Sequence, residues 1–162
     1  MSDEICYRPI GFIRTPFQTT GGMPIQPAGA ENIIGIVEID PRHEAGLADL
    51  DGFSHVILIY AFHQVTGYSL SVTPFLDDTP RGLFATRAPR RPNPIGLSVV
   101  RLLEVTGCTL RVQGVDILDG TPLLDLKPFL PEFDAPTVER IGWLQPQSGR
   151  VRGMRADDRF RS

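Results

Sequence analysis

The sequence contains few of the residues that build disulfide scaffolds or metal centres. Its 162 residues include two cysteines, three histidines and one tryptophan. Cys6 and Cys108 lie far apart, and neither has a histidine or a second cysteine at a spacing typical of metal ligands. We therefore expect no metal site. Because both cysteines lie in segments that resemble strands, we predict that both thiols belong to the core.

Long hydrophobic runs are also missing. No apolar stretch approaches the roughly 20 residues that a membrane helix needs. The N-terminus, Met1 to Glu4, is acidic and leads into mixed sequence, unlike a basic secretory signal. We therefore expect a cytoplasmic protein without a membrane partner. The length fits one domain, which at this size buries about 70% of the surface of its unfolded chain.

Lysine is nearly absent, since only Lys127 among the 16 basic residues is a lysine. The formal net charge of −3 argues against a protein that grips nucleic acid with its whole surface. Arginine offers a planar fork that suits carboxylate and phosphate groups, so the places where arginines gather are informative. We expect a domain over residues 5–140 and an arginine-rich polar tail over residues 141–162.

Glycine and proline are abundant and separate short segments rich in Val, Ile, Leu and Phe, which indicates an all-β protein. Helical periodicity is weak, and only His43 to Asp49 is predicted to form two turns. Asp119-Gly120 predicts a hairpin, because glycine supplies the positive φ of a tight turn. Thr15 to Glu31 should form a long functional loop. The predicted strands are Ile10–Arg14, Ile33–Ile39, Val56–Phe62 as a central strand, Gly82–Thr86, Leu97–Val105, Leu110–Leu118 and Leu123–Leu126.

The richest candidate site is the stretch RGLFATRAPRRPNPIGLS, from Arg81 to Ser98. Prolines stiffen this loop, so its arginines lose little conformational freedom on binding an anion. Asn93 lies between two prolines and is held in extended backbone. The alternative interpretation is a proline-rich turn with solvated arginines. The cationic candidates are Arg81, Arg87, Arg90 and Arg91.

A second candidate is DILDGTPLLDLK, from Asp116 to Lys127. Gly120 would let the backbone approach a flat ligand, although Asp-Gly-Thr-Pro is also a common turn. Asp116, Asp119 or Asp125 could accept a proton from a reacting amine. A surface salt bridge with Lys127 is an equally good interpretation of Asp125.

Two histidines flank the predicted central strand. His55 precedes it and His63 follows it, and strand ends are natural pocket rims. A structural hydrogen-bonding role is the alternative for both. As possible catalytic residues we therefore consider His55, His63 and Asp116, and the sequence does not decide which of them receives a proton.

The order of these segments resembles the TrmO-type (TsaA-like, YaeB-like) tRNA methyltransferase family over about Ile10 to Pro131. The most specific motif is Phe84-Ala85-Thr86-Arg87 followed by Arg91-Pro92-Asn93-Pro94-Ile95-Gly96. The supporting motifs are Gly11-Phe12-Ile13-Arg14 with Pro16, Phe53-Ser54-His55, Asp119-Gly120-Thr121-Pro122 and Asp125-Leu126-Lys127-Pro128.

The resemblance implies a single small, mostly antiparallel β-barrel with one or two short helices and long functional loops. It also implies a homodimer that binds S-adenosyl-L-methionine near the subunit interface and methylates N6 of threonylcarbamoyladenosine at position 37 of tRNA. Longer members add a C-terminal domain. The cofactor contacts that carry over are Pro24, Ile25, Gln26, Phe62, His63, Arg87, Arg91, Leu118, Asp119, Gly120 and Thr121.

Other functions are open at this point. A barrel that binds S-adenosylmethionine as a sensor, or transfers methyl to a protein or small molecule, fits the same residues. A barrel that binds single-stranded RNA without chemistry would need exposed aromatic residues, but aromatic content is only 8%.

Overall fold

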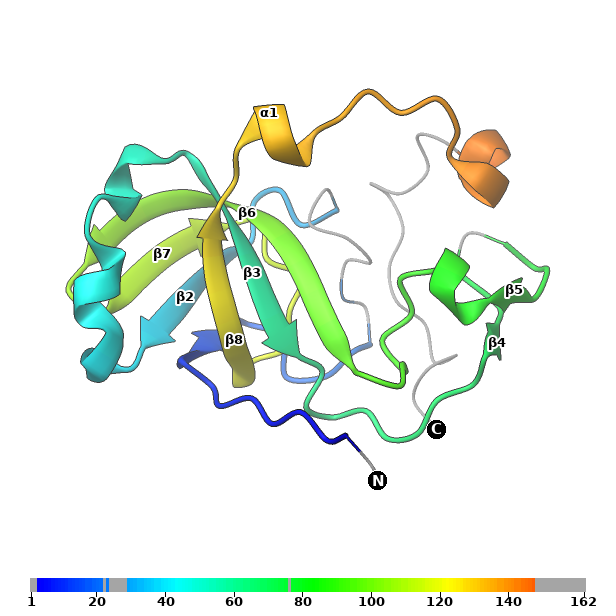
Figure 1. The fold of residues 1–162 in the computed structure, drawn as a ribbon, viewed down its shortest axis with the longest axis horizontal. Helices are drawn as coiled ribbons and strands as arrows, with labels where there is room; N and C mark the ends of the chain where they lie inside the picture. Colours follow the sequence, from blue (N-terminus) through cyan, green and yellow to red (C-terminus); the bar gives the residue numbers. More distant parts are fainter. Residues whose placement is uncertain (1–2, 22, 24–28, 76, 148–162) are drawn as a thin grey trace.

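The computed structural model describes residues 3–21, 23, 29–75 and 77–147. Six strands close a barrel in the order β1-β2-β7-β6-β3-β8, and every neighbouring pair is antiparallel (Figure 1). The predicted all-β barrel is therefore confirmed. The strands are β1 (Gly11–Arg14), β2 (Ile34–Ile39), β3 (His55–Ala61), β6 (Ile95–Thr106), β7 (Thr109–Gln113) and β8 (Thr121–Pro128).

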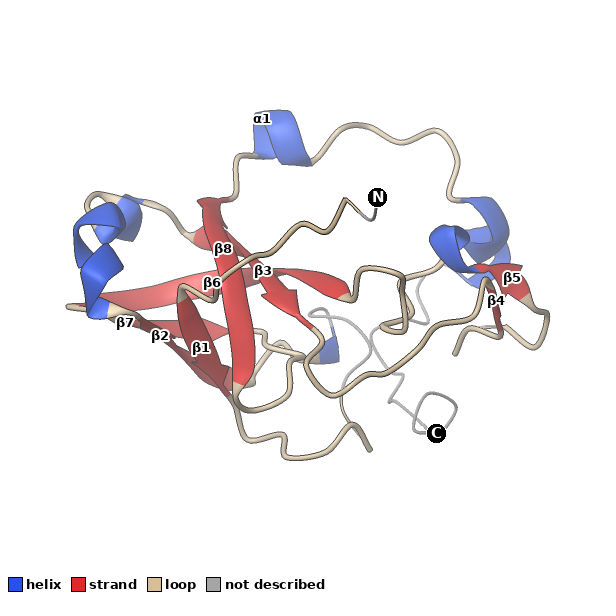
Figure 2. Cartoon of the chain, turned by 60° about the horizontal axis from the view of Figure 1, so that its bottom comes forward, coloured by secondary structure: helices blue, strands red, loops and turns tan. Residues whose placement is uncertain are grey.

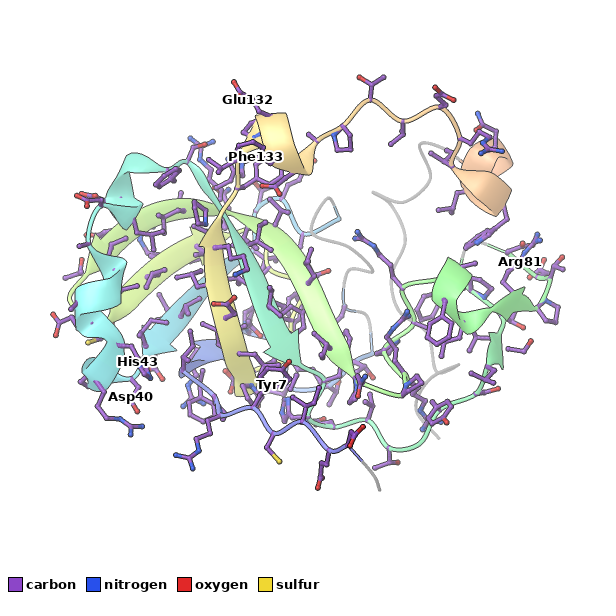
Figure 3. All side chains as sticks on the ribbon, viewed as in Figure 1. Tyr7, Asp40, His43, Arg81, Glu132 and Phe133 are labelled. Carbon is purple, nitrogen blue, oxygen red and sulfur yellow. The ribbon has the colours of Figure 1, made fainter. Side chains whose placement is uncertain are left out.

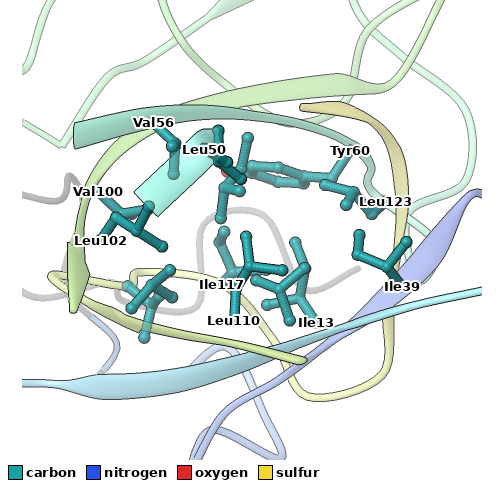
Figure 4. Packing of buried hydrophobic residues seen from close by; sticks show 14 of the residues in the cluster. Ile13, Ile39, Leu50, Val56, Tyr60, Val100, Leu102, Leu110, Ile117 and Leu123 are labelled. Carbon is teal, nitrogen blue, oxygen red and sulfur yellow. The ribbon is translucent and has the colours of Figure 1, made fainter. Parts of the chain in front are cut away.

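The core fills the barrel with inward side chains of alternating strand residues. Along β3, Val56, Leu58 and Tyr60 are buried, whereas the residues between them are half-buried. Figure 4 shows Tyr60 beside Leu123 within this cluster. β3 pairs with β6 on one side and β8 on the other, as expected for a central strand.

The long strand β6 explains a sequence pattern that alternates only partly. Gly96, Ser98, Val100 and Leu102 all face inward, so Ser98 is a polar residue at a core position. Beyond Leu102 the register with β7 shifts, and the alternation ends there because an irregular pairing changes which side chains face the core.

The helical prediction identified the right region but the wrong type of helix. Residues Pro41–Leu47 form the 3₁₀ helix η2, which begins at a proline and is followed by η3 (Leu50–Gly52). The one described α-helix, α1 (Pro131–Asp134), follows β8.

Two predicted elements are wrong. Gly82–Thr86 is not a barrel strand, because only Arg81–Gly82 (β5) pairs, with Ser71–Val72 (β4), before the 3₁₀ helix η4 (Leu83–Ala85) begins. Asp119-Gly120 does not close a hairpin, because β7 ends at Gln113 and is not a neighbour of β8. Residues 114–120 instead connect two strands that are not adjacent in the barrel.

The β4–β5 pair and η4 lie outside the barrel, beside the 3₁₀ helix η5 (Gly142–Gln147), in both Figure 1 and Figure 2. The indole Nε1 of Trp143 donates a hydrogen bond to the carbonyl of Ala85 at 2.8 Å. The Arg81 guanidinium lies 5.6 Å from the centroid of the Trp143 ring. The predicted tail thus begins with a docked segment, and its five arginines from Arg150 onward lie outside the described residues.

The prediction of core thiols is wrong for one cysteine. Cys6 is exposed because it precedes β1 in a segment that is not a strand. Cys108 is half-buried at the turn between β6 and β7, where it packs against the core.

Candidate functional site

One end of the barrel gathers the predicted site residues. Because the strands are antiparallel, β1, β3 and β7 end at the same rim where β2, β6 and β8 begin. We call this rim the site end. Three connections leave it, formed by residues 15–33, 62–94 and 114–120. They carry every cofactor contact that the resemblance implies except Thr121, which begins β8 at the same rim. Pro24, Ile25 and Gln26 lie outside the described residues.

His63 and Thr121 meet at the site end. The Thr121 hydroxyl donates to the carbonyl of Leu118 at 2.7 Å, and the same oxygen lies 3.4 Å from His63 Nδ1. Because the hydroxyl has one proton, already used at Leu118, it accepts from Nδ1–H. This tautomer leaves Nε2 of His63 as the acceptor. Phe62 packs edge-on against Tyr60 with ring centroids 5.5 Å apart.

Asp119 fastens the connection 114–120 to the end of β1. Its carboxylate accepts the backbone N–H of Thr15 at 3.0 Å, and this hydrogen bond holds the pKa of Asp119 below its usual value. The Thr15 hydroxyl donates to the carbonyl of Ile117 at 2.6 Å. Gly120 has φ of +74°, a backbone conformation that favours glycine. This part of the rim is therefore a fixed turn.

Asp116 is a half-buried carboxylate in the connection 114–120 at the site end. Its Oδ1 accepts a hydrogen bond from the Ser98 hydroxyl at 2.8 Å, and Ser98 Oγ lies 3.0 Å from the Tyr60 hydroxyl. Burial raises the pKa of Asp116 to about 6, although the Ser98 hydrogen bond and the positive charge of Arg87 act in the opposite direction. A carboxyl with a pKa near neutrality is suited to accept a proton at physiological pH.

The proline-stiffened segment 86–94, which we call the arginine loop and which carries Arg87, Arg90 and Arg91, approaches this carboxyl. Arg87 is exposed, and its charge lowers the pKa of both Asp116 and Tyr60, which places it near the site end. Arg91 Nη1 donates to the carbonyls of Thr86 and Ala88 at 2.9 and 3.2 Å, and its guanidinium lies over Phe84. Arg91 therefore fixes the shape of the loop as well as adding charge.

His55 lies at the opposite end of the barrel from the other two candidate catalytic residues. It begins β3, and its ring Nδ1 lies 2.9 Å from Ser54 Oγ. The six residue steps to Ala61 span about 20 Å. Figure 3 marks the same far end by Asp40 and His43, which follow β2, away from Arg81. The structure brings His63 and Asp116 to one rim and does not bring His55 there.

Sequence reasoning missed Ser98 and Tyr60. Ser98 is 1% exposed and Tyr60 5%, and both are needed to describe the surroundings of Asp116. The available signal was a serine at an inward position of an apolar strand. Of the two interpretations left open for Asp125, the structure shows the salt bridge with Lys127, whose charged atoms are 2.7 Å apart.

The chemistry open to this rim is binding an anion and accepting a proton. No three histidine, cysteine, aspartate or glutamate side chains in the described ranges gather closely enough to hold a metal ion. No helix in the described part of the chain combines the length and apolar composition that a membrane crossing requires. The fold and the rim together define a small β-barrel protein with a half-buried carboxylate and a cationic loop at one end.

The chain belongs to the family described as the tRNA-methyltransferase O N-terminal domain, whose model matches residues 12–135. The resemblance read from the motifs is therefore confirmed. A crystal structure of TrmO from Pseudomonas aeruginosa is 39% identical, with a TM-score of 0.73, over 86% of this chain and 62% of that chain.

Two curated relatives have different names. A probable S-adenosyl-L-methionine-binding protein of Pyrococcus abyssi is 53% identical over 96% of this chain and 85% of its own length. The Homo sapiens tRNA (adenine(37)-N6)-methyltransferase is 35% identical over 79% of this chain and 31% of its own length. The chain thus spans about a third of the human relative and most of the archaeal one.

Proposed function

We propose that this protein is a cytoplasmic, S-adenosylmethionine-dependent methyltransferase that acts on N6 of threonylcarbamoyladenosine at position 37 of tRNA. The observation that carries the proposal is the half-buried Asp116 carboxyl, at the same barrel end as the arginine loop. The family membership and the name of the human relative support the choice of reaction.

The residues at the site end fit the proposed cofactor. Arg90 Nε is buried and has no hydrogen-bond partner in the described structure. A buried donor of this kind calls for an acceptor, and the carboxylate of S-adenosylmethionine is a suitable one. Gly120 has no side chain to keep the flat adenine from its backbone, although its own N–H donates to the carbonyl of Ile13 at 2.8 Å. Arg87 and Arg91 add positive charge around the carboxylate of the cofactor.

In the proposed reaction the cofactor supplies a methyl group from its sulfonium, and the sulfur keeps the electron pair of the broken C–S bond. The protein holds the acceptor nitrogen in line with the methyl carbon and the sulfur. Asp116 takes the proton of this nitrogen as the N–C bond forms. His63 Nε2, an acceptor at the same rim, is the second candidate for this proton. No metal is needed for these steps.

A second candidate function is a protein that binds S-adenosylmethionine with a different acceptor or as a sensor. The name of the Pyrococcus abyssi relative favours it. The chain also spans only 62% of the matching TrmO crystal structure, so that protein has further residues that this chain does not match. Labelled methyl from S-adenosylmethionine separates the two functions. The enzyme transfers it to total tRNA, whereas the second candidate binds the cofactor and leaves tRNA unlabelled.

The arginine loop should determine cofactor affinity. We expect Arg87→Ala and Arg91→Ala to weaken S-adenosylmethionine binding by about 10- to 100-fold, because each removes a charged hydrogen-bond donor worth about 1.5–3 kcal/mol. Arg91→Lys should restore little, since lysine cannot make the two-pronged contact. Calorimetry measures the three dissociation constants.

The matched control is Arg42→Ala, which removes an exposed arginine that pairs with Asp40 at the far end of the barrel. Its dissociation constant should equal that of the wild type. If Arg87→Ala and Arg91→Ala also bind the cofactor normally, the arginine loop is not its binding site.

The proposed homodimer has a candidate surface on the outer face of β3 and β6. Three apolar cross-strand pairs face outward there, and Ile95 and Leu97 are 42% and 50% exposed. This face begins at the site end, so a second copy packed on it would lie next to the rim. The pairs are Ile57 with Val99, Ile59 with Leu97, and Ala61 with Ile95.

Sedimentation tests this surface. We expect a wild-type dimer at micromolar concentration and a monomer for Leu97→Asp, because a buried unpaired carboxylate opposes association. Val138→Asp, which changes an exposed valine elsewhere, should sediment as a dimer. A monomeric wild type would refute the homodimer, and a dimeric Leu97→Asp would place its interface on another face.

A further inference from the structure

A chain of two hydrogen bonds, the first buried and the second part-buried, runs from the barrel interior to Asp116. Tyr60 belongs to β3 and Ser98 to β6, and both side chains point inward. Tyr60 Oη lies 3.0 Å from Ser98 Oγ, which lies 2.8 Å from Asp116 Oδ1. Two buried polar side chains of the core are thus connected to a half-buried carboxyl at the site end.

The direction of the two hydrogen bonds follows from counting protons. An ionised carboxylate only accepts, so Ser98 donates its single hydroxyl proton to Asp116. Ser98 Oγ must then accept the other hydrogen bond, and Tyr60 donates it. The order is Tyr60 to Ser98 to Asp116 whenever Asp116 is ionised.

The Tyr60 ring occupies the space next to Gly96, a residue without a side chain on the neighbouring strand. Gly96 is the cross-strand partner of Tyr60, and a Cβ at Gly96 would lie 2.2 Å from Tyr60 Cε2. The ring occupies this space and lies against Phe62. Burial raises the pKa of Tyr60, so the phenol stays protonated and keeps its proton to donate to Ser98.

We propose that Ser98 and Tyr60 are positioning residues, which hold one oxygen of Asp116 in place and keep its carboxyl ionised for proton transfer. This inference rests on the proposed function, because it assumes that Asp116 receives the proton. This chain of two hydrogen bonds, which we call the relay, does not carry the proton away from Asp116, because Tyr60 at its other end is a buried phenol that does not ionise.

The charged and titratable groups around Asp116 set the expected pH dependence. Ser98 from β6 and Arg87 from the connection 62–94 both favour the ionised carboxyl, whereas burial opposes it. Tyr60 from β3 is neutral and acts through Ser98. Removing the Ser98 hydroxyl should therefore raise the pKa of Asp116, and removing the Tyr60 hydroxyl should raise it less.

The test compares Ser98→Ala and Tyr60→Phe with the wild type by carbon-13 NMR titration of the Asp116 carboxyl. Loss of the resonance in Asp116→Asn identifies it. For Ser98→Ala we expect the ratio of protonated to ionised carboxyl to rise about tenfold at a given pH. For Tyr60→Phe, which removes only the phenol oxygen and its proton, we expect a smaller rise in this ratio. Ser54→Ala, at the far end of the barrel, should leave the titration unchanged.

The same variants are then assayed for methyl transfer as a function of pH. The acid limb of the kcat profile should move to higher pH, by more in Ser98→Ala than in Tyr60→Phe. A purely structural defect would instead lower kcat equally at every pH. An unchanged Asp116 titration in Ser98→Ala, or a moved titration with an unmoved acid limb, overturns the inference. A wild type that transfers no methyl refutes the proposed function instead, and the titration alone then decides whether the relay exists.

Discussion

Asp116→Asn is expected to lower the single-turnover rate of methyl transfer by about 10²- to 10⁴-fold, the usual contribution of a general base. Asparagine keeps the shape of the side chain and still accepts the hydrogen bond from Ser98, but it cannot take up a proton. Cofactor binding should change little, because the arginines that favour the cofactor carboxylate are intact. Rapid-quench transfer of labelled methyl to tRNA measures the rate, and calorimetry measures the binding.

The matched control is Asp125→Asn, which makes the same chemical change in a half-exposed salt bridge. It should transfer methyl at the wild-type rate. An Asp116→Asn rate within a fewfold of the wild type would exclude Asp116 as the base and direct attention to His63.

Stability measurements guard against misfolding of Asp116→Asn. In the wild type the folded-state pKa of Asp116 is raised from 3.8 to about 6, so the folded protein holds this proton more tightly than the unfolded chain. That contribution to stability is complete below about pH 4 and is lost as pH rises through 6, a loss of about 2–3 kcal/mol. Asparagine does not ionise, so Asp116→Asn does not lose this stability as pH rises. At pH 7.5 the variant should therefore unfold at a denaturant concentration no lower than that of the wild type.

Gly96→Ala should be the most destabilising single-methyl change near the site. The new Cβ would meet the Tyr60 ring at 2.2 to 2.9 Å, and the ring is held by Ser98 and by packing. Overpacking of a buried side chain costs about 1–3 kcal/mol, which corresponds to a fall of about 2–4 °C in Tm for each kcal/mol. Chemical denaturation and thermal unfolding both measure it.

Gly46→Ala is the control, because a Cβ at Gly46 meets nothing within 4 Å. Its stability should match or slightly exceed that of the wild type. In the double variant Gly96→Ala/Tyr60→Leu the clash is removed, so the two losses should be strongly non-additive. Additive losses would mean that Gly96 and Tyr60 do not compete for the same space.

Much of the barrel was predictable from the sequence, because alternating apolar residues mark strands whose inner face is buried. All six barrel strands start within two residues of their predicted positions. Their closure into a barrel came from the family resemblance. The alternation in β6 could be followed only as far as the irregular pairing after Leu102, since a shift of register changes which face is buried.

The errors have a common physical cause. Asp119-Gly120 is a genuine turn with a positive φ at the glycine, but a local signal does not specify which strands pair across it. The same limit applies to His55 and His63, because a strand of seven residues separates them by the length of the barrel. Ser98 and Tyr60 were missed because a relay through the core depends on the register of three elements.

The most direct test of the account is nucleoside mass spectrometry on tRNA from a strain without this activity, after incubation with the protein and S-adenosylmethionine. The account predicts a methyl group on threonylcarbamoyladenosine from position 37, and its absence when Asp116→Asn replaces the wild type. Intact cofactor binding with no methylated nucleoside would contradict it and favour a different acceptor or a sensing role.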